Sequence, residues 1–201
     1  MIATLPATTR RELAELAGAY GQPLVQTVDL APNGYLTSEN LAVGNGEVCI
    51  VVRRISGQLL TFRKTFYPPG VFRLLTGGIA SGERVLDAVR RESHEETGLQ
   101  TEVRRLLAVV AYATGGVDSL SIFYTVAFLL DEVGGILGAL DEHEQVEAFR
   151  NIEPAELLTI ADQLDHLGLG YADELNARWH DWGRFRAVIH RVVWTALESP
   201  A

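Results

Sequence analysis

A stripe that is apolar at one end and acidic at the other is the feature of this sequence best suited to chemistry. The pattern over residues 82–97 predicts a helix, and 3.6 residues per turn place four side chains on one face: Val85, Val89, Glu92 and Glu96. A stripe that packs inward should not end in acids unless their charge is compensated. Hard divalent cations are the natural compensation, because they bind carboxylate oxygens.

A pair of glycines precedes this helix and adds to the candidate site. Gly77 and Gly78 let the backbone approach a bound group closely, while Glu83 and Glu95 border the same acidic cluster. Positioned Mg²⁺ ions neutralise a diphosphate, bridge its oxygens and activate water. The alternative is a solvated acidic face, in which Arg91 and Glu95 form an ordinary i,i+4 pair worth about 0.2–0.5 kcal/mol. That alternative leaves the glycine pair and the acids on the packing stripe unexplained.

The spacing of these residues closely resembles the Nudix box. Gly77 is followed after five residues by Glu83 and after seven more by residues 91–99, as in the pattern G-x5-E-x7-R-E-U-x-E-E-x-G-U. Every glycine, arginine and glutamate position of the pattern is present, which makes the motif specific. The one departure is Ser93, where the family usually has a bulky aliphatic residue. Its hydroxyl can bond back to the helix, so we expect a local packing change there.

This resemblance implies a fold, a cofactor and a reaction. The fold is an α/β (α+β) Nudix fold, in which a mixed β-sheet is sandwiched between helices. The cofactor is Mg²⁺ or Mn²⁺, held by Glu92, Glu95 and Glu96, with Glu83 and the carbonyl of Gly77 as further candidate ligands. Arg91 would orient a carboxylate through a salt bridge. Water would cleave a nucleoside diphosphate joined to another group, as in a nucleotide sugar such as ADP-ribose, a dinucleotide or a nucleoside triphosphate.

The general base is left open by the resemblance, because members of the family differ. Some use a glutamate of the box, for which Glu92 is the candidate. Others use an acid from a loop beyond the sheet, and the acidic residues 141–144 lie in that place. Within this region we favour Glu144 over Glu142 and Glu147. A solvated acidic turn is an equal alternative for the loop.

The box does not set the identity of the substrate, so its recognition must come from other residues. The candidates are Arg63 and Arg73 for phosphate contact, Gly78 for close approach and Phe149 for stacking on a base. Surface solvation and core packing are the more common roles of such arginines and aromatics. The ADP-ribose-cleaving subgroup commonly carries a proline shortly beyond the box, where this chain has residues 114–116, Thr-Gly-Gly. This difference weakens an ADP-ribose assignment without excluding it.

The elements that must position these residues alternate between helix and strand. The pattern predicts helices at 10–20, 82–97, 154–164 and within 173–197, and strands at 24–30, 47–53, 58–66, 71–75, 101–113 and 119–130. Gly98 is placed to end the acidic helix. We expect residues 1–40 to be an N-terminal extension packed on a Nudix domain that spans residues 41–201. The segment Trp179 to Arg186 is interpreted as a helix start docked on that domain, in preference to a lid or a subunit contact.

Composition limits the partners. The chain has 201 residues, of which 47% are hydrophobic, and a formal net charge of −9, which argues against a broad nucleic-acid interface. No apolar run is long enough to span a membrane, and the start of the chain lacks the pattern of a secretory signal. Cys49 is the single cysteine and excludes an internal disulfide. We therefore expect a cytoplasmic protein with a small-molecule nucleotide substrate, and the resemblance favours a homodimer.

Two other functions remain open. A Nudix domain can recognise a nucleotide without cleaving it, as in some regulators, but the intact box argues against this. An isomerase of prenyl diphosphates resembles the same fold, but it relies on a cysteine in the site, and Cys49 lies within a predicted apolar strand.

Overall fold

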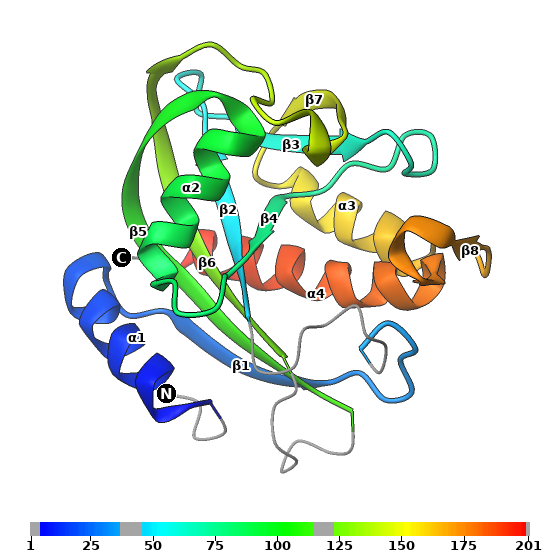
Figure 1. The fold of residues 1–201 in the computed structure, drawn as a ribbon, viewed down its shortest axis with the longest axis horizontal. Helices are drawn as coiled ribbons and strands as arrows, with labels where there is room; N and C mark the ends of the chain where they lie inside the picture. Colours follow the sequence, from blue (N-terminus) through cyan, green and yellow to red (C-terminus); the bar gives the residue numbers. More distant parts are fainter. Residues whose placement is uncertain (1–4, 37–45, 115–122, 200–201) are drawn as a thin grey trace.

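A seven-stranded mixed β-sheet forms the centre of the molecule and has helices on both faces (Figure 1). The computed structural model describes residues 5–36, 46–114 and 123–199. In chain order the elements are α1 (Ala7–Tyr20), β1 (Leu24–Asp29), β2 (Glu47–Arg53), β3 (Leu59–Lys64), β4 (Leu75–Gly78), α2 (Val85–Thr97), β5 (Leu99–Ala113), β6 (Phe123–Gly135), the 3₁₀ turn η1 (Glu142–Glu144), β7 (Val146–Ile152), α3 (Glu156–Asp165), β8 (Tyr171–Ala172), the 3₁₀ turn η2 (Asp173–Leu175), β9 (Ala177–Arg178) and α4 (Trp179–Glu198).

The strands of the main sheet follow the order β1-β5-β6-β2-β3-β7, and β4 pairs with β2 outside this path. Strand β1 is parallel to β5 and β2 is parallel to β6, whereas the other pairs are antiparallel. Strand β2 lies between neighbours and is buried along all of its length except Arg53. Its continuous apolar sequence therefore matches its place inside the sheet. The predicted α+β class with a mixed sheet between helices is confirmed.

The side chains of β2 alternate between two hydrophobic cores, one on each face of the sheet. Cys49 and Val51 join the core covered by α3 and α4, whereas Val48, Ile50 and Val52 join the core covered by α1 and α2. This alternation follows from the two-residue period of a strand. The two faces of the sheet are thus closed by different helix pairs, and the acidic helix α2 belongs to the second pair (Figure 1).

Helix α2 is fixed at both ends. At its start, the backbone N–H of Val85 donates to the carboxylate of Glu12 in α1 at 2.8 Å, so an acid from another helix satisfies a free N-terminal donor. At its end, Gly98 adopts the left-handed conformation (φ 65°), and its N–H donates to the carbonyl of His94 at 2.8 Å. The prediction that Gly98 ends this helix is confirmed.

Several predicted boundaries were wrong, and three of them lie beside the site or in the sheet. The strand expected at 71–75 is β4, which begins only at Leu75 and contains both glycines, because Gly77 and Gly78 pair with the open N-terminal half of β2. Helix α2 starts at Val85 and not at Gly82, whose φ of +79° does not fit a right-handed helix. Strand β6 runs on to Gly135, while the first residues of the strand predicted at 119–130 lie outside the described residues.

The chain before β2 shares the sheet with the rest of the molecule. Strand β1 pairs in parallel with β5 along all six of its residues, and Leu13 and Leu16 of α1 are buried in the core beside α2. The boundary that the sequence predicts near residue 40 lies outside the described residues. The division into residues 1–40 and 41–201 therefore stays a prediction.

The aromatic start of α4 packs onto the domain, as the sequence suggested. Trp182 is buried, and the rings of Trp179 and Trp182 meet the ring of Tyr67 edge-on at centroid distances of 6.1 and 5.0 Å. The helix predicted within residues 173–197 begins at Trp179, because residues 171–178 form the small sheet β8-β9 and η2. None of the described helices is long and apolar enough to cross a membrane.

The buried His190 in α4 should make the stability of the folded protein depend on pH. It is buried, its Nε2 accepts the backbone N–H of Leu74 at 2.9 Å, and its Nδ1 lies 2.8 Å from the carbonyl of Arg186. Burial, aided by nearby arginines, lowers the pKa of His190 to about 3, so its contribution to stability is complete above pH 6.5 and is lost as pH falls toward 3. Denaturant titrations would measure the free energy of unfolding at pH 7 and at pH 5. Between these two values we expect it to fall by about 2 kcal/mol more in the wild type than in His190→Gln.

The matched control for this measurement is His166→Gln, which alters an exposed histidine. Its loss of stability between the same two pH values should equal that of the wild type. Equal losses in His190→Gln and the wild type would contradict the assignment.

Candidate functional site

The acidic end of the α2 stripe is buried against the sheet. Glu92 is 6% exposed and Glu96 is 0% exposed, and Val85 and Val89 of the same stripe are also buried. The helical spacing seen in the sequence therefore describes a real inward face. Ser93 is buried on α2 as well, but its hydroxyl pairs with that of Thr101 on β5 at 3.1 Å, so the expected bond back to the helix is not formed.

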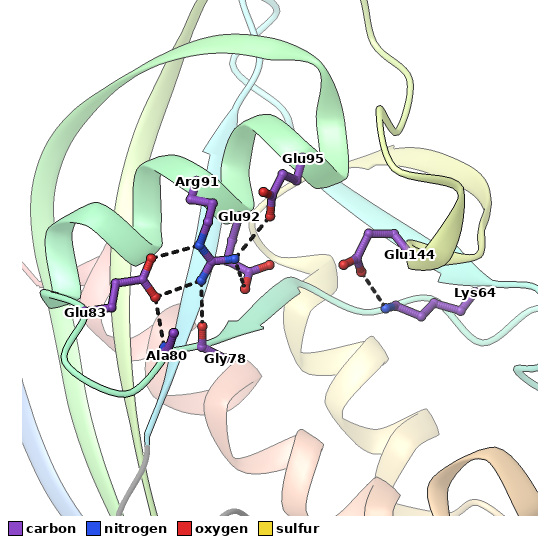
Figure 2. A network of polar contacts seen from close by, with 8 residues as sticks. All are labelled: Lys64, Gly78, Ala80, Glu83, Arg91, Glu92, Glu95 and Glu144. Carbon is purple, nitrogen blue, oxygen red and sulfur yellow. Dashed lines mark hydrogen bonds and ion pairs between the residues drawn. The ribbon is translucent and has the colours of Figure 1, made fainter.

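Arg91 connects the carboxylates around α2, and Figure 2 shows its guanidinium between them. Its Nε and Nη2 donate to the two oxygens of Glu83 at 2.8 Å each, and its Nη1 donates to Glu92 at 2.8 Å and to Glu95 at 3.1 Å. The carbonyl of Gly78 accepts a further bond from Nη2 at 3.0 Å. These bonds from Arg91 lower the pKa of Glu83. The resemblance implied that Arg91 orients one carboxylate, and the structure shows that it binds three.

Gly77 lets β4 and α2 approach each other closely. A Cβ placed on Gly77 would lie 1.9 Å from the Cδ of Glu92 and 2.2 Å from its Oε2. Any other residue at this position would therefore push the Glu92 carboxylate out of its place. The sequence suggested that this glycine admits a bound group, and the structure adds that it admits Glu92.

Glu96 is a buried carboxylate without a hydrogen-bond partner. Neither of its oxygens has one in the described part of the chain. Burial raises the pKa of Glu96 to about 8, with Glu144 and Glu92 adding to the rise while Arg73 and Lys64 oppose it. Burial also raises the pKa of Glu92, against the effect of Arg91. An unpaired buried carboxylate is costly, and a cation within reach of its oxygens would remove that cost.

The residues around Glu96 fit a hard divalent cation. Glu92 and Glu96 offer oxygen ligands from adjacent turns of α2, and the glycine at position 77 leaves room for the Glu92 carboxylate. Within residues 5–36, 46–114 and 123–199, no three His, Cys, Asp or Glu side chains already lie in an arrangement that could hold an ion. In the structure, Arg91 binds three of the carboxylates, so a metal would require some of these bonds to change.

Glu144 approaches this cluster from the other side. It ends η1, and its Oε2 accepts a hydrogen bond from the Nζ of Lys64 on β3 at 2.9 Å. In Figure 2 its carboxylate faces the acidic end of α2. The charge of Glu144 raises the pKa of both Glu92 and Glu96, which places the three acids in one electrostatic neighbourhood.

The other two acids considered as bases lie differently. Glu147 on β7 forms an ion pair with Arg63 at 2.6 Å. The side chain of Glu142 lies outside the described residues. Of the two candidates whose side chains are described, Glu144 is the one that the structure brings to the box.

A cavity of about 360 Å³ lies beside the glycine strand β4. Gly77 and Gly78 line it, together with Lys64 and Arg73. Arg73 is buried, and it donates to the hydroxyl of Tyr67 at 2.7 Å and to that of Thr76 at 2.8 Å. Arg73 and Gly78, which the sequence proposed for substrate binding, are therefore brought to one cavity.

The other two substrate candidates do not line this cavity. Arg63 forms an ion pair with Glu147, and Phe149 packs against the core beside α2, directly across from Phe62 of β3. Their roles in binding stay predictions.

Sequence reasoning missed a buried ion pair that also lines the cavity. The Nη1 of Arg186 on α4 lies 2.7 Å from each oxygen of Glu47 at the start of β2. The hydroxyl of Thr125 donates to the same carboxylate at 2.8 Å. The two charged residues are 139 positions apart, so no local pattern joins them. The available signal was a charged residue directly before the apolar run of β2.

Comparisons with known proteins identify the family of this chain. A family model described as "NUDIX domain" matches residues 45–169. The ADP-ribose pyrophosphatase of Methanocaldococcus jannaschii is 36% identical over 99 residues, which are 49% of this chain and 57% of that protein, so the match spans little more than half of the relative.

Two solved structures show weaker similarity. An ADP-ribose pyrophosphatase from Streptococcus suis has 16% identity and a TM-score of 0.44 over 78% of this chain and 94% of its own. A NUDIX hydrolase from Nitrosomonas europaea has 15% identity and a TM-score of 0.47 over 71% and 90%. The family model spans the greater part of the chain and includes the whole box with its acids and glycines. This chain therefore belongs to the NUDIX family.

Proposed function

We propose that this chain is a pyrophosphohydrolase that uses Mg²⁺ or Mn²⁺ to cleave a nucleoside diphosphate joined to another group. The observation that carries the proposal is Glu96, a fully buried carboxylate whose two oxygens have no partner in the described part of the chain. It stands beside Glu92 and the Arg91 network, close to a cavity that is large enough for part of a nucleotide.

In this proposal Glu92, Glu95 and Glu96 hold the metal, with Glu83 and the carbonyl of Gly77 as further ligands. When bound, the metal would supply charge neutralisation of the diphosphate and activation of water. Arg91 keeps Glu83, Glu92 and Glu95 pointing to one place, because its five donors form a rigid fork.

Glu144 is the proposed general base. It would accept a proton from the attacking water, and Lys64 would fix the direction of its carboxylate through their ion pair. The water oxygen forms a new bond to one phosphorus, and the bond from that phosphorus to the bridging oxygen breaks. The products are a nucleoside monophosphate and a phosphorylated remainder.

ADP-ribose is the first substrate to test, because the relative from M. jannaschii carries that name. The absence of the subgroup's proline at residues 114–116 argues for a wider search, and Gly115 and Gly116 lie outside the described residues. Dinucleotides and nucleoside triphosphates are therefore the next classes. The homodimer implied by the resemblance also stays a prediction, which light scattering of the purified chain would check.

The decisive experiment is a hydrolysis panel of ADP-ribose, other nucleotide sugars, dinucleotides and nucleoside triphosphates, with Mg²⁺, with Mn²⁺ and with a chelator. We expect one class to be cleaved and the chelator to stop its cleavage. Binding of these compounds without any release of monophosphate or phosphate would instead identify a non-hydrolytic regulatory module.

Once a substrate is known, Glu144→Gln tests the general base. Because Gln cannot accept the proton, we expect kcat to fall by about 100- to 10,000-fold while KM changes little. The control is Glu153→Gln, which alters an exposed acid just beyond β7. Unchanged turnover in Glu144→Gln would transfer the role of base to Glu92.

A further inference from the structure

The ion pair between Glu47 and Arg186 is buried and also borders the cavity. The two residues are 5% and 7% exposed, and both line the cavity that Gly77 and Gly78 also line. Glu47 lies directly opposite Gly78 in the pairing of β2 with β4. The Nη1 of Arg186 binds both carboxylate oxygens at 2.7 Å, and the hydroxyl of Thr125 donates to one of them. The pair is therefore held in a fixed orientation.

Arg186 keeps donors that the described residues do not use. Its Nε is buried and has no hydrogen-bond partner in the described part of the chain, and its hydrogen bonds to other described residues all leave from Nη1. The Oε2 of Glu47 accepts only the bond from Arg186 among these residues, so it can accept another. The pair thus offers an unused donor and an unused acceptor side by side.

Stability alone does not account for such a pair. Replacing a buried ion pair by apolar residues of similar size is often neutral or stabilising, because taking two charges out of water is costly. The buried Nε of Arg186 adds a further cost, since a buried donor without an acceptor loses its bond to water. A ligand that supplies the missing partners would remove this cost.

The surroundings indicate what that ligand is. Five aromatic side chains line the same cavity: Tyr35, Phe66, Tyr67, Phe123 and Trp182. Aromatic walls favour a flat, apolar group. The pair of Glu47 and Arg186 has no net charge, and the carboxylate would repel a phosphate placed against it. A flat group that carries both a donor and an acceptor on one edge fits these conditions, and a nucleobase has that chemistry.

We propose that this part of the cavity binds the nucleobase of the substrate, with Arg186 donating to a ring acceptor and Glu47 accepting from the neighbouring N–H. The inference rests on the proposed function, because it names the group of the proposed substrate that this ion pair would bind. Arg186 and Trp182 belong to α4, beyond the residues 45–169 that match the family model. Base recognition therefore depends on a part of this chain that the family model does not cover.

The test measures binding without metal, so that it does not depend on hydrolysis. Calorimetry would compare the four nucleoside monophosphates with ribose 5-phosphate. We expect at least one monophosphate to bind about 10-fold or more tightly than ribose 5-phosphate, because only the monophosphates carry a base. Equal affinities, or no binding of any monophosphate, would overturn the proposal even if the hydrolysis panel finds a substrate.

The variant for this assay is the double substitution Glu47→Met with Arg186→Met, which leaves no unpaired charge in the core. We expect the preferred monophosphate to bind about 10- to 100-fold more weakly to it, while ribose 5-phosphate binding is unchanged. Its matched control is Arg54→Met with Glu132→Met, which removes the half-buried ion pair at the opposite end of β2. Circular dichroism and the melting temperature verify folding of both.

If the double variant of Glu47 and Arg186 melts far below the control, the single substitution Glu47→Gln takes its place, because it keeps the size of the side chain. In Glu47→Gln the preference for one base over the others should change, since an acceptor is exchanged for a group that also donates. Unchanged affinity and unchanged base preference in a folded variant would contradict the proposal.

Discussion

Replacing Glu96 by Gln should lower kcat by at least about 100-fold, the range seen when a group that stabilises transition-state charge is removed. The reason is that Glu96 has no partner in the described part of the chain other than the cation that we propose. Steady-state kinetics with the substrate found in the panel would measure the effect. Asp87→Asn is the matched control, because Asp87 lies on the exposed face of the same helix and should leave kcat unchanged.

The same substitution has a second consequence for the metal-free protein. The pKa of Glu96 is raised from 4.5 to about 8, so the stability associated with its protonated form is present below pH 4.5 and is lost as pH rises toward 8. By pH 7 the loss is on the order of 3 kcal/mol. Glu96→Gln does not ionise, so at pH 7 the metal-free variant should melt about 6–12 °C above the metal-free wild type.

Addition of Mg²⁺ should make the wild type melt above the Glu96→Gln variant. The ion stabilises the charged form of Glu96 in the wild type, whereas the variant lacks this ligand. Melting curves at pH 5 and pH 7, with and without Mg²⁺, would test both statements. A variant that keeps wild-type turnover and wild-type melting at pH 7 would show that Glu96 is not a metal ligand.

The site on α2 could be predicted from the sequence because its parts are local. Helical periodicity alone places Glu92 and Glu96 on the inward face, and a glycine at position 98 is enough to end the helix. The side-chain hydrogen bonds of Arg91 reach residues at most 13 positions away. Contacts over such short separations follow from helix geometry, so the box and its acids could be predicted without knowledge of the fold.

The features that the sequence did not show depend on pairing across the chain. Strand β4 contains two glycines and forms only because β2 offers it an open edge. The contact of Lys64 with Glu144 spans 80 positions, and that of Glu47 with Arg186 spans 139. No periodicity connects residues so far apart. The cavity between these elements could therefore not be predicted from the sequence pattern.

Replacing Gly77 by Ala should abolish most of the hydrolysis without unfolding the protein. The added Cβ would lie 1.9 Å from the Cδ of Glu92, so one of the two must move. The atoms that it meets are the end of a flexible side chain, and for this reason we expect Glu92 to rotate away while the strand stays paired. The melting temperature should then change by only a few degrees, whereas kcat should fall by about 100-fold, as for loss of a charge-stabilising group.

Two other glycines separate this effect from a general cost of alanine in place of glycine. At Gly168, in the loop after α3, an added Cβ meets nothing within 4 Å, so Gly168→Ala should keep wild-type kinetics. At Gly78 an added Cβ also meets nothing within 4 Å, although Gly78 lines the cavity, so Gly78→Ala should lose less activity than Gly77→Ala. Equal losses of activity at positions 77 and 78 would show that the activity depends on the whole of strand β4 and not on the space beside Glu92. A loss confined to position 77 would show that the glycine is needed to keep the Glu92 carboxylate in place.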